Sequence, residues 1–128
     1  MSGRPEVTYH DMPVGRTFTP HQFDLRQDEI DAYQAIFTEG RDVVPTGLLA
    51  VHARNAYNTD GPTPSGGVMA SMTFRLRQKL IAATGYEFRA TVIEQFERKG
   101  KGWVRFENVL DRDEAYVATV EIVGVWPL

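Results

Sequence analysis

The chain has 128 residues, of which 42% are hydrophobic and 24% charged, an ordinary composition for a globular domain large enough to bury a core. A net charge of −3 argues against a basic surface for nucleic acid, and the lack of cysteine excludes disulfides, thiolate catalysis and cysteine-ligated metals. No apolar run approaches the roughly 20 residues of a membrane span, and residues 1–15 lack the apolar centre of a signal peptide, so we expect a cytoplasmic protein.

The N-terminal third is predicted to hold an irregular arm, a strand and a helix. Residues 1–15 form the arm of a single domain that spans residues 1–128. Residues 17–25 are consistent with a short strand interrupted by a proline, and His21 in this segment is expected at the surface. Apolar residues at helical spacing after an acidic start predict a helix over about residues 28–37.

A second helix is predicted to begin at Pro45 or Thr46 and to end near residue 57. It is apolar around most of its circumference, which is typical of a helix at the centre of a fold. The segment 58–67 is dense in Gly, Pro, Asn and Thr and is predicted to be a loop.

Beyond this loop the apolar pattern has a period of two, which predicts strands. Short turns between the later runs favour an antiparallel meander. The strands cover about residues 68–77, 88–95, 103–110 and 115–126. Two sets of residues are expected each to share one strand face: Val68, Ala70, Met72, Phe74 and Leu76, and Phe88, Ala90, Val92 and Glu94.

This order of elements indicates the α+β class, with a curved antiparallel sheet wrapped around a long central helix. Such a sheet leaves an edge unpaired, and a second subunit is the cover that we expect for it.

The chain resembles the MaoC-like hydratase/dehydratase family of the hotdog-fold superfamily over residues 12–126. The resemblance rests on segments 14–18 (VGRTF), 27–33 (QDEIDAY) and 85–88 (GYEF), together with the order of the elements. It implies the hotdog fold and an acyl-thioester substrate. Coenzyme A or the pantetheine of an acyl carrier would then arrive as part of the substrate, with no separate cofactor and no metal.

Active members of that family carry Gly-Asp-x-Asn-Pro-Leu-His, whose aspartate and histidine add water to a trans-2-enoyl thioester or remove it. On residues 40–47 (GRDVVPTG) the resemblance places Asp42 at the aspartate position and Gly47 at the histidine position. The usual dyad therefore cannot form from this segment, which could also be simply the start of the central helix. Asp42 is either a surviving acid/base or a helix N-cap. His52 is either a replacement base or a hydrogen-bonded interior or interface histidine.

Further residues are candidates for substrate binding, each with a structural alternative. Asn55 could contact a ligand or only end the helix. The glycines Gly66 and Gly67 could admit pantetheine against the strand, or only serve a turn. Arg75 could meet coenzyme A phosphates or lie on a solvated strand face. Gly47 is the remaining candidate for substrate binding.

The leading hypothesis is an (R)-specific enoyl-CoA hydratase or 3-hydroxyacyl dehydratase that uses Asp42 and His52. One alternative is a non-catalytic hotdog subunit that pairs with an active MaoC-like partner. Another is an acyl-CoA thioesterase that uses a carboxylate on or before the helix. All three predict a homodimer or a heterodimer of hotdog subunits.

Overall fold

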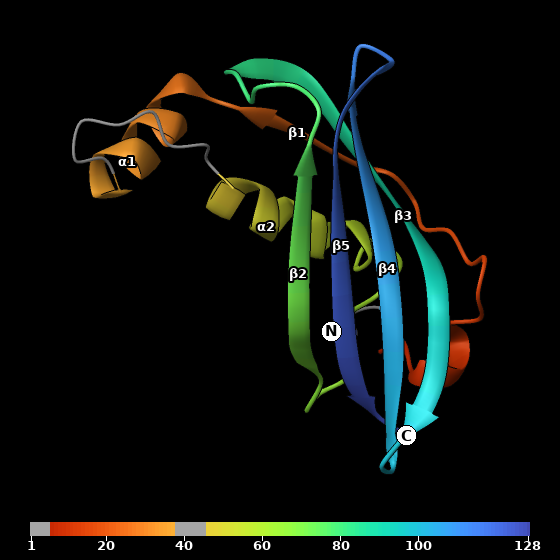
Figure 1. Cartoon of the computed structure of the whole chain (residues 1–128). Coiled ribbons are helices and arrows are strands. Elements are labelled where there is room, and N and C mark those ends of the chain that lie inside the picture. Colours follow the sequence, from red (N-terminus) through yellow and green to blue (C-terminus); the bar gives the residue numbers. More distant parts are fainter. Residues whose placement is uncertain (1–5, 38–45) are drawn as a thin grey trace, which may run out of the picture.

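A curved antiparallel sheet wraps around one helix in the computed structural model, which describes residues 6–37 and 46–128 (Figure 1). The elements are η1 (Tyr9–Asp11), β1 (His21–Leu25), α1 (Gln27–Phe37), α2 (Thr46–Ala56), β2 (Val68–Leu76), β3 (Ala83–Arg98), β4 (Lys101–Arg112) and β5 (Ala115–Pro127). The strands lie in the order β1–β3–β4–β5–β2, so that β3, β4 and β5 form the predicted meander.

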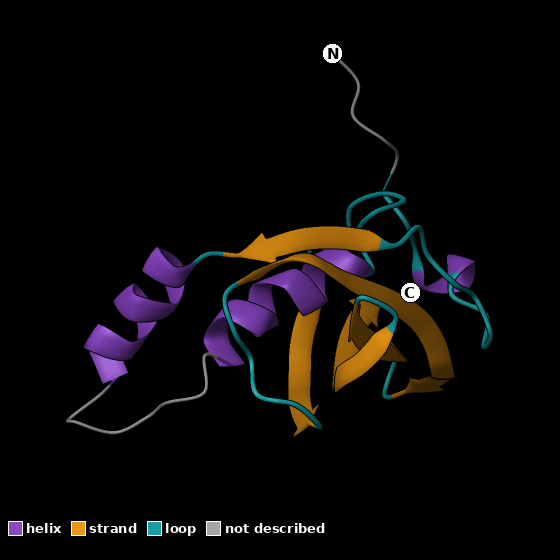
Figure 2. Cartoon of the chain, turned by 90° about the horizontal axis from the view of Figure 1, so that it is seen from above, coloured by secondary structure: helices purple, strands orange, loops and turns teal. Residues whose placement is uncertain are grey.

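Helix α2 lies inside the curve of the sheet, whereas α1 projects beyond it (Figure 2). Leu49 and Ala53 of α2 are fully buried against the concave face, where the strands present Phe88, Phe106 and Ile122. Burial of each large apolar side chain contributes about 1.5–3 kcal/mol, and the small Ala53 lets the helix approach the sheet closely. The predicted α+β hotdog arrangement is therefore confirmed.

The N-terminal segment covers the edge of β3 that β1 leaves free. The amide of Gly15 donates to the Val92 carbonyl at 2.8 Å, and the Val92 amide donates to the Arg16 carbonyl at 2.9 Å. Tyr9 of η1 is 6% exposed and lies so close to Gly102 of β4 that a β-carbon there would overlap its ring. In the described part of the segment predicted as an irregular arm, Val7, Tyr9 and Met12 are thus buried in the core, while the residues between them are exposed.

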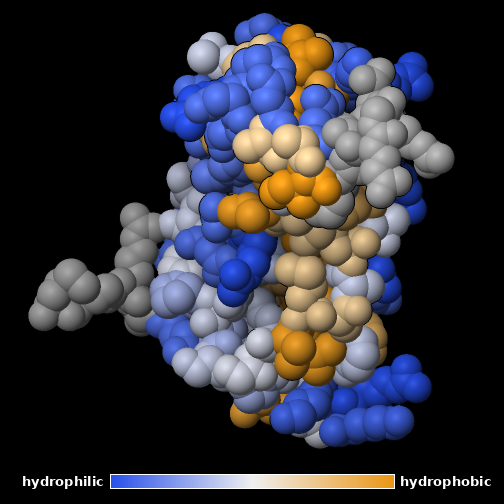
Figure 3. Space-filling model, turned by 90° about the vertical axis from the view of Figure 1, so that its left-hand side faces the viewer, coloured by the Kyte–Doolittle hydropathy of each residue, from blue (hydrophilic) through white to orange (hydrophobic). Residues whose placement is uncertain are grey.

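The opposite edge of the sheet, β2, has a different character. It pairs with β5 on one side, and no other described strand pairs with it. Val68 is 63% and Met69 41% exposed, and Ala70 is exposed as well. A band of apolar surface runs along the side of the molecule that carries α1, α2 and β2 (Figure 3). An open, partly apolar edge of this kind is a template for pairing with another chain.

Two bulges change which residues face the core. The register of β2 shifts between Met69 and Ser71, so Val68 and Ala70 are exposed, contrary to the prediction of one continuous buried face. The register of β3 shifts between Val92 and Glu94, and Glu94 binds Arg105 on the convex face, contrary to the prediction that it shares the face of Val92. A bulge inserts one residue and reverses the alternation beyond it.

Candidate functional site

The first turn of α2 contains Gly47, the residue that the sequence resemblance places at a histidine position. Its amide donates to the Tyr33 hydroxyl of α1 at 3.3 Å. A β-carbon on Gly47 would lie 2.6 Å from Cε2 of Tyr33, so a side chain there could form only if Tyr33 moved away. Asp42, the other half of the predicted motif, lies outside the described residues.

His52 faces β1 from the middle of α2. Its ring is stacked on Phe23 with centroids 3.8 Å apart, and its Nδ1 lies 3.0 Å from Nε2 of His21, close enough to share a hydrogen bond. His21 is therefore not the surface residue that the sequence led us to expect, because it is partly buried in this histidine pair. The interaction joins the edge strand to the central helix.

The pair is adapted to remain uncharged. Burial lowers the pKa of both imidazoles below the usual 6.5. For His52 the neighbouring His21 lowers the pKa further, while the Glu29 carboxylate of α1 opposes the shift. Phe23, stacked on His52, offers no charge, so a neutral pair with one donor and one acceptor is the form that fits.

We expect stability to fall as the pH drops below 6.5, the pKa of an unburied histidine. Below this pH the histidines of the unfolded chain take up protons, whereas the folded pair stays neutral. The stabilisation by the neutral pair is therefore fully present above the unfolded pKa and is lost as the pH falls through the lower pKa values of the folded pair. Urea unfolding midpoints between about pH 5 and 8 measure it. His52→Gln should flatten the profile and His10→Gln, which removes an exposed imidazole, serves as the matched control; an unchanged slope in His52→Gln would contradict the assignment.

Two adjoining cavities lie at the C-terminal end of α2. The larger, a shallow and widely open cavity of about 590 Å³, is lined by Arg54, Asn55, Asn58, Gly61, Pro62 and Thr63. The smaller, of about 50 Å³, is lined by Arg54, Tyr57, Thr63, Gly67, Val68, Met69, Gly124 and Trp126. Arg54 and Thr63 belong to both, so the structure brings together two of the predicted binding residues, Asn55 and Gly67. Neither imidazole of the histidine pair lines either cavity.

Gly66 and Arg75 lie apart from these cavities. Gly66 has φ of 82°, and no atom lies near its missing β-carbon, so its glycine suits the turn into β2. Arg75 pairs with Glu121 at 3.6 Å on the convex face, where Arg105 joins Glu121 to Glu94. That face is turned away from α2.

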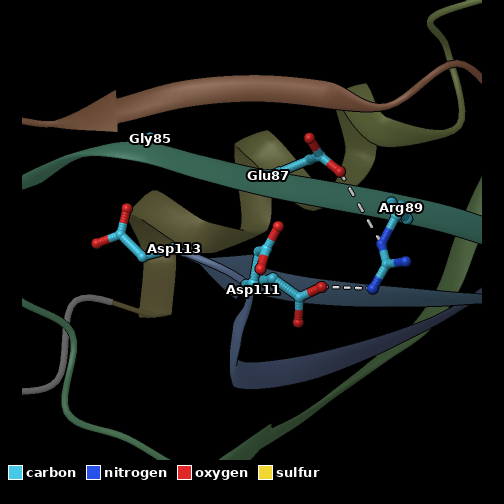
Figure 4. Close-up of a pocket in the computed structure, with 6 residues that line it drawn as sticks. Gly85, Glu87, Arg89, Asp111 and Asp113 are labelled. Atoms are coloured by element: carbon cyan, nitrogen blue, oxygen red, sulfur yellow. Dashed lines mark hydrogen bonds and ion pairs between the residues drawn. The ribbon is translucent and has the colours of Figure 1, made fainter.

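A third cavity, of about 330 Å³, lies beside the β4–β5 turn. Its lining includes Glu87, Asp111, Asp113 and Glu114, and Arg89, the one cation among its described lining residues, binds Glu87 and Asp111 (Figure 4). An excess of carboxylates repels phosphate groups, so this cavity is unsuited to coenzyme A.

Sequence reasoning singled out neither Arg54, Thr63 nor Trp126. Arg54 lies in the last turn of α2 and Tyr57 is the first residue beyond it, and this spacing of three is a signal that could have linked them. Trp126 comes from the far end of β5, and only the folded sheet brings it to the helix end.

In residues 6–37 and 46–128, no group of three or more His, Cys, Asp or Glu side chains could hold a metal ion. None of the helices in this part of the chain is long and apolar enough to cross a membrane.

The sequence matches no protein-family model and no curated protein. Solved structures nevertheless share the fold. The R-hydratase PhaJ1 from Pseudomonas aeruginosa gives a TM-score of 0.68 at 16% identity, covering 95% of this chain and 86% of that chain. The MaoC-like dehydratase from Rhodospirillum rubrum gives 0.69 at 14% identity, covering 95% and 98%.

The HadBC complex, a 3R-hydroxyacyl-ACP dehydratase from Mycobacterium tuberculosis, gives 0.63 at 16% identity, covering 88% of this chain and 96% of that chain. The TM-scores establish a shared hotdog fold. At identities this low, the likeness does not by itself assign an activity.

Proposed function

We propose that this chain is a subunit of an acyl-thioester hydratase/dehydratase in which it helps to bind the substrate while a partner hotdog chain supplies the catalytic dyad. The observation that carries the proposal is the environment of Gly47, where the Tyr33 ring occupies the space that a histidine side chain would need. The substrate would bring its own coenzyme A or carrier pantetheine, and no further cofactor is required.

The fold relatives support this substrate class. They include an R-hydratase and a 3R-hydroxyacyl-ACP dehydratase, and the latter is a complex. In such chemistry a base near neutral pKa activates water, and a hydrogen-bond donor polarises the thioester carbonyl. Here the first-turn amide of Gly47 already donates to the hydroxyl of Tyr33, which is a poor arrangement for a catalytic donor.

The free edge of β2 supports pairing with a second subunit. Val68, Met69 and Ala70 at its start are exposed and apolar, and no other described strand pairs with this edge. On the other side of the sheet, residues 15–18 pair with the part of β3 that β1 leaves free. Addition of a strand to β2 would satisfy its outward backbone groups and bury this apolar surface.

The test is hydration of crotonyl-CoA by the chain alone and after coexpression with a hotdog chain of the same organism that carries the intact Asp/His motif. We expect the two chains to copurify and the pair to be at least about a hundredfold more active than this chain alone. Replacing the partner's motif histidine by alanine should abolish activity without separating the chains. A stable homodimer of this chain that hydrates crotonyl-CoA would overturn the proposal.

The histidine pair favours a second candidate, in which the chain is itself the hydratase or dehydratase. A neutral His52 could accept a proton, with His21 fixing its orientation through the 3.0 Å contact. If the isolated chain is active, His52→Gln should then reduce kcat by about a hundredfold or more. Retention of full activity in His52→Gln would exclude this candidate.

A further inference from the structure

The small cavity at the end of α2 combines several hydrogen-bond donors with little competition from acceptors. Of the residues that line it, Arg54, Tyr57, Thr63 and Trp126 carry side-chain N–H or O–H groups. Among the residues that the structure describes, no Asp or Glu lines either this cavity or the larger one beside it. The acidic cavity near the β4–β5 turn has the opposite composition.

Tyr57 is a fixed donor in this cavity. Its ring is stacked on Phe106 with centroids 4.1 Å apart and an interplanar angle of 6°, and the residue is 5% exposed. Burial raises the pKa of its phenol to about 12, so the hydroxyl keeps its proton at neutral pH. No hydrogen bond joins this hydroxyl to another residue in the part of the chain that the structure describes.

Trp126 places its indole N–H edge beside the cavity. A β-carbon on Gly124 would lie 2.8 Å from Nε1, and one on Gly67 would lie 3.2 Å from Cδ1. Both glycines line the cavity, and their lack of a side chain lets the indole lie against their backbone at the cavity wall. Trp126 is only 3% exposed, and its position is held by the core.

Arg54 supplies the charge. It forms no ion pair with a carboxylate of the described residues, and among those residues it is the only cationic one that lines the two cavities. The C-terminal end of α2 carries the negative end of the helix dipole, which further limits the negative charge that the site can accept. One guanidinium therefore suits a group with a single negative charge better than a phosphate monoester.

We propose that the small cavity binds a carboxylate group, with Arg54, Tyr57 and Trp126 as its donors, and that the larger cavity holds the rest of a small hydroxy acid. Arg54 and Thr63 line both spaces, so one ligand can extend from one into the other. The exposed amide of Asn55 in the larger cavity can hydrogen-bond to a hydroxyl group on that ligand. The inference does not rest on thioester chemistry. Val68 and Met69 of the small cavity also belong to the β2 edge, so binding is tested on the chain without a partner.

The experiment uses Trp126 itself as the reporter. The chain has two tryptophans, and Trp103 can be replaced by phenylalanine because it lies in a stacked pair with Phe96 on the outer face. In the full-length Trp103→Phe protein we expect 3-hydroxybutyrate to change the fluorescence of Trp126 saturably. Neither 3-hydroxybutyramide, which lacks the charge, nor inorganic phosphate should match it.

Variants assign the effect to the cavity. Tyr57→Phe keeps the stacked ring and Arg54→Met keeps the aliphatic stem, and each should weaken 3-hydroxybutyrate binding about tenfold or more. Arg77→Met, which removes an exposed arginine outside the cavities, is the matched control and should bind normally. Unfolding midpoints establish that each variant is folded.

Three results would overturn the proposal. They are no saturable change with 3-hydroxybutyrate, equal binding by the Arg54→Met protein, and equal or tighter binding of inorganic phosphate. Because 3-hydroxybutyrate is not a thioester and the chain is tested alone, such a failure would not contradict the proposed function. A failure of the proposed function would likewise not contradict the binding of 3-hydroxybutyrate.

Discussion

Replacing Gly102 by alanine should lower the free energy of unfolding by about 3 kcal/mol, although alanine is ordinarily acceptable in a strand. The added β-carbon would overlap the ring of Tyr9, which lies directly on the backbone of β4. Tyr9 is anchored because its carbonyl accepts hydrogen bonds from the Gln95 side chain at 2.7 Å and the Met12 amide at 3.1 Å. Relief of the overlap therefore requires η1 to leave its place, and urea denaturation measures the cost.

A double-mutant cycle with Tyr9→Ala provides the control. Once the ring is gone, Gly102→Ala should be neutral or slightly stabilising, since alanine loses less conformational entropy than glycine on folding. The coupling energy between the two sites should then approach the whole effect of the single substitution. Equal costs of Gly102→Ala in both backgrounds would show that the packing of Tyr9 is not the cause.

Replacing Phe23 by alanine should cost about 3–5 kcal/mol, the range for deletion of a buried aromatic ring. Phe23 is 8% exposed and stacks on His52, with Tyr86 and Phe88 at centroid distances of 5.5 Å and 5.7 Å. Its removal leaves a cavity between β1 and α2 and admits water to the histidine pair. We expect the pKa of His52 to rise toward the usual 6.5, which an NMR titration would detect.

Phe96→Ala is the matched control for Phe23→Ala. Phe96 is 37% exposed and stacks on Trp103 on the outer face, so its loss should cost only about 1 kcal/mol and leave the His52 titration unchanged. Similar costs at the two positions would mean that the Phe23 stack does not hold β1 to α2.

Much of the fold could be predicted from local pattern. The second helix was predicted from Pro45 or Thr46 to about residue 57 and is observed at Thr46–Ala56, because an apolar segment between a helix start and a dense run of turn residues has few alternatives. The meander followed from short turns between runs of period two. The bulges at 69–71 and 92–94 could not be predicted, because the alternation of apolar and polar residues does not show where a strand inserts an extra residue.

The candidate site was less predictable. Asn55 and Gly67 were singled out and lie at adjoining cavities, but their roles in binding stay predictions. Asp42 lies outside the described residues, and Arg75 lies on the convex face in an ion pair. The contact between His21 and His52 joins residues 31 positions apart, a distance at which periodicity holds no information.

The sequence by itself determined the class of fold, the central helix and the lack of a histidine at position 47, because these depend on residue type and on spacing over one or two turns. Only the tertiary structure decided that Tyr33 occupies the space beside Gly47 and that Arg54, Tyr57 and Trp126 share one cavity. Such contacts between distant residues depend on the strand order, the positions of the bulges and the direction of α2 across the sheet. All three are set by packing of the whole chain rather than by any local segment.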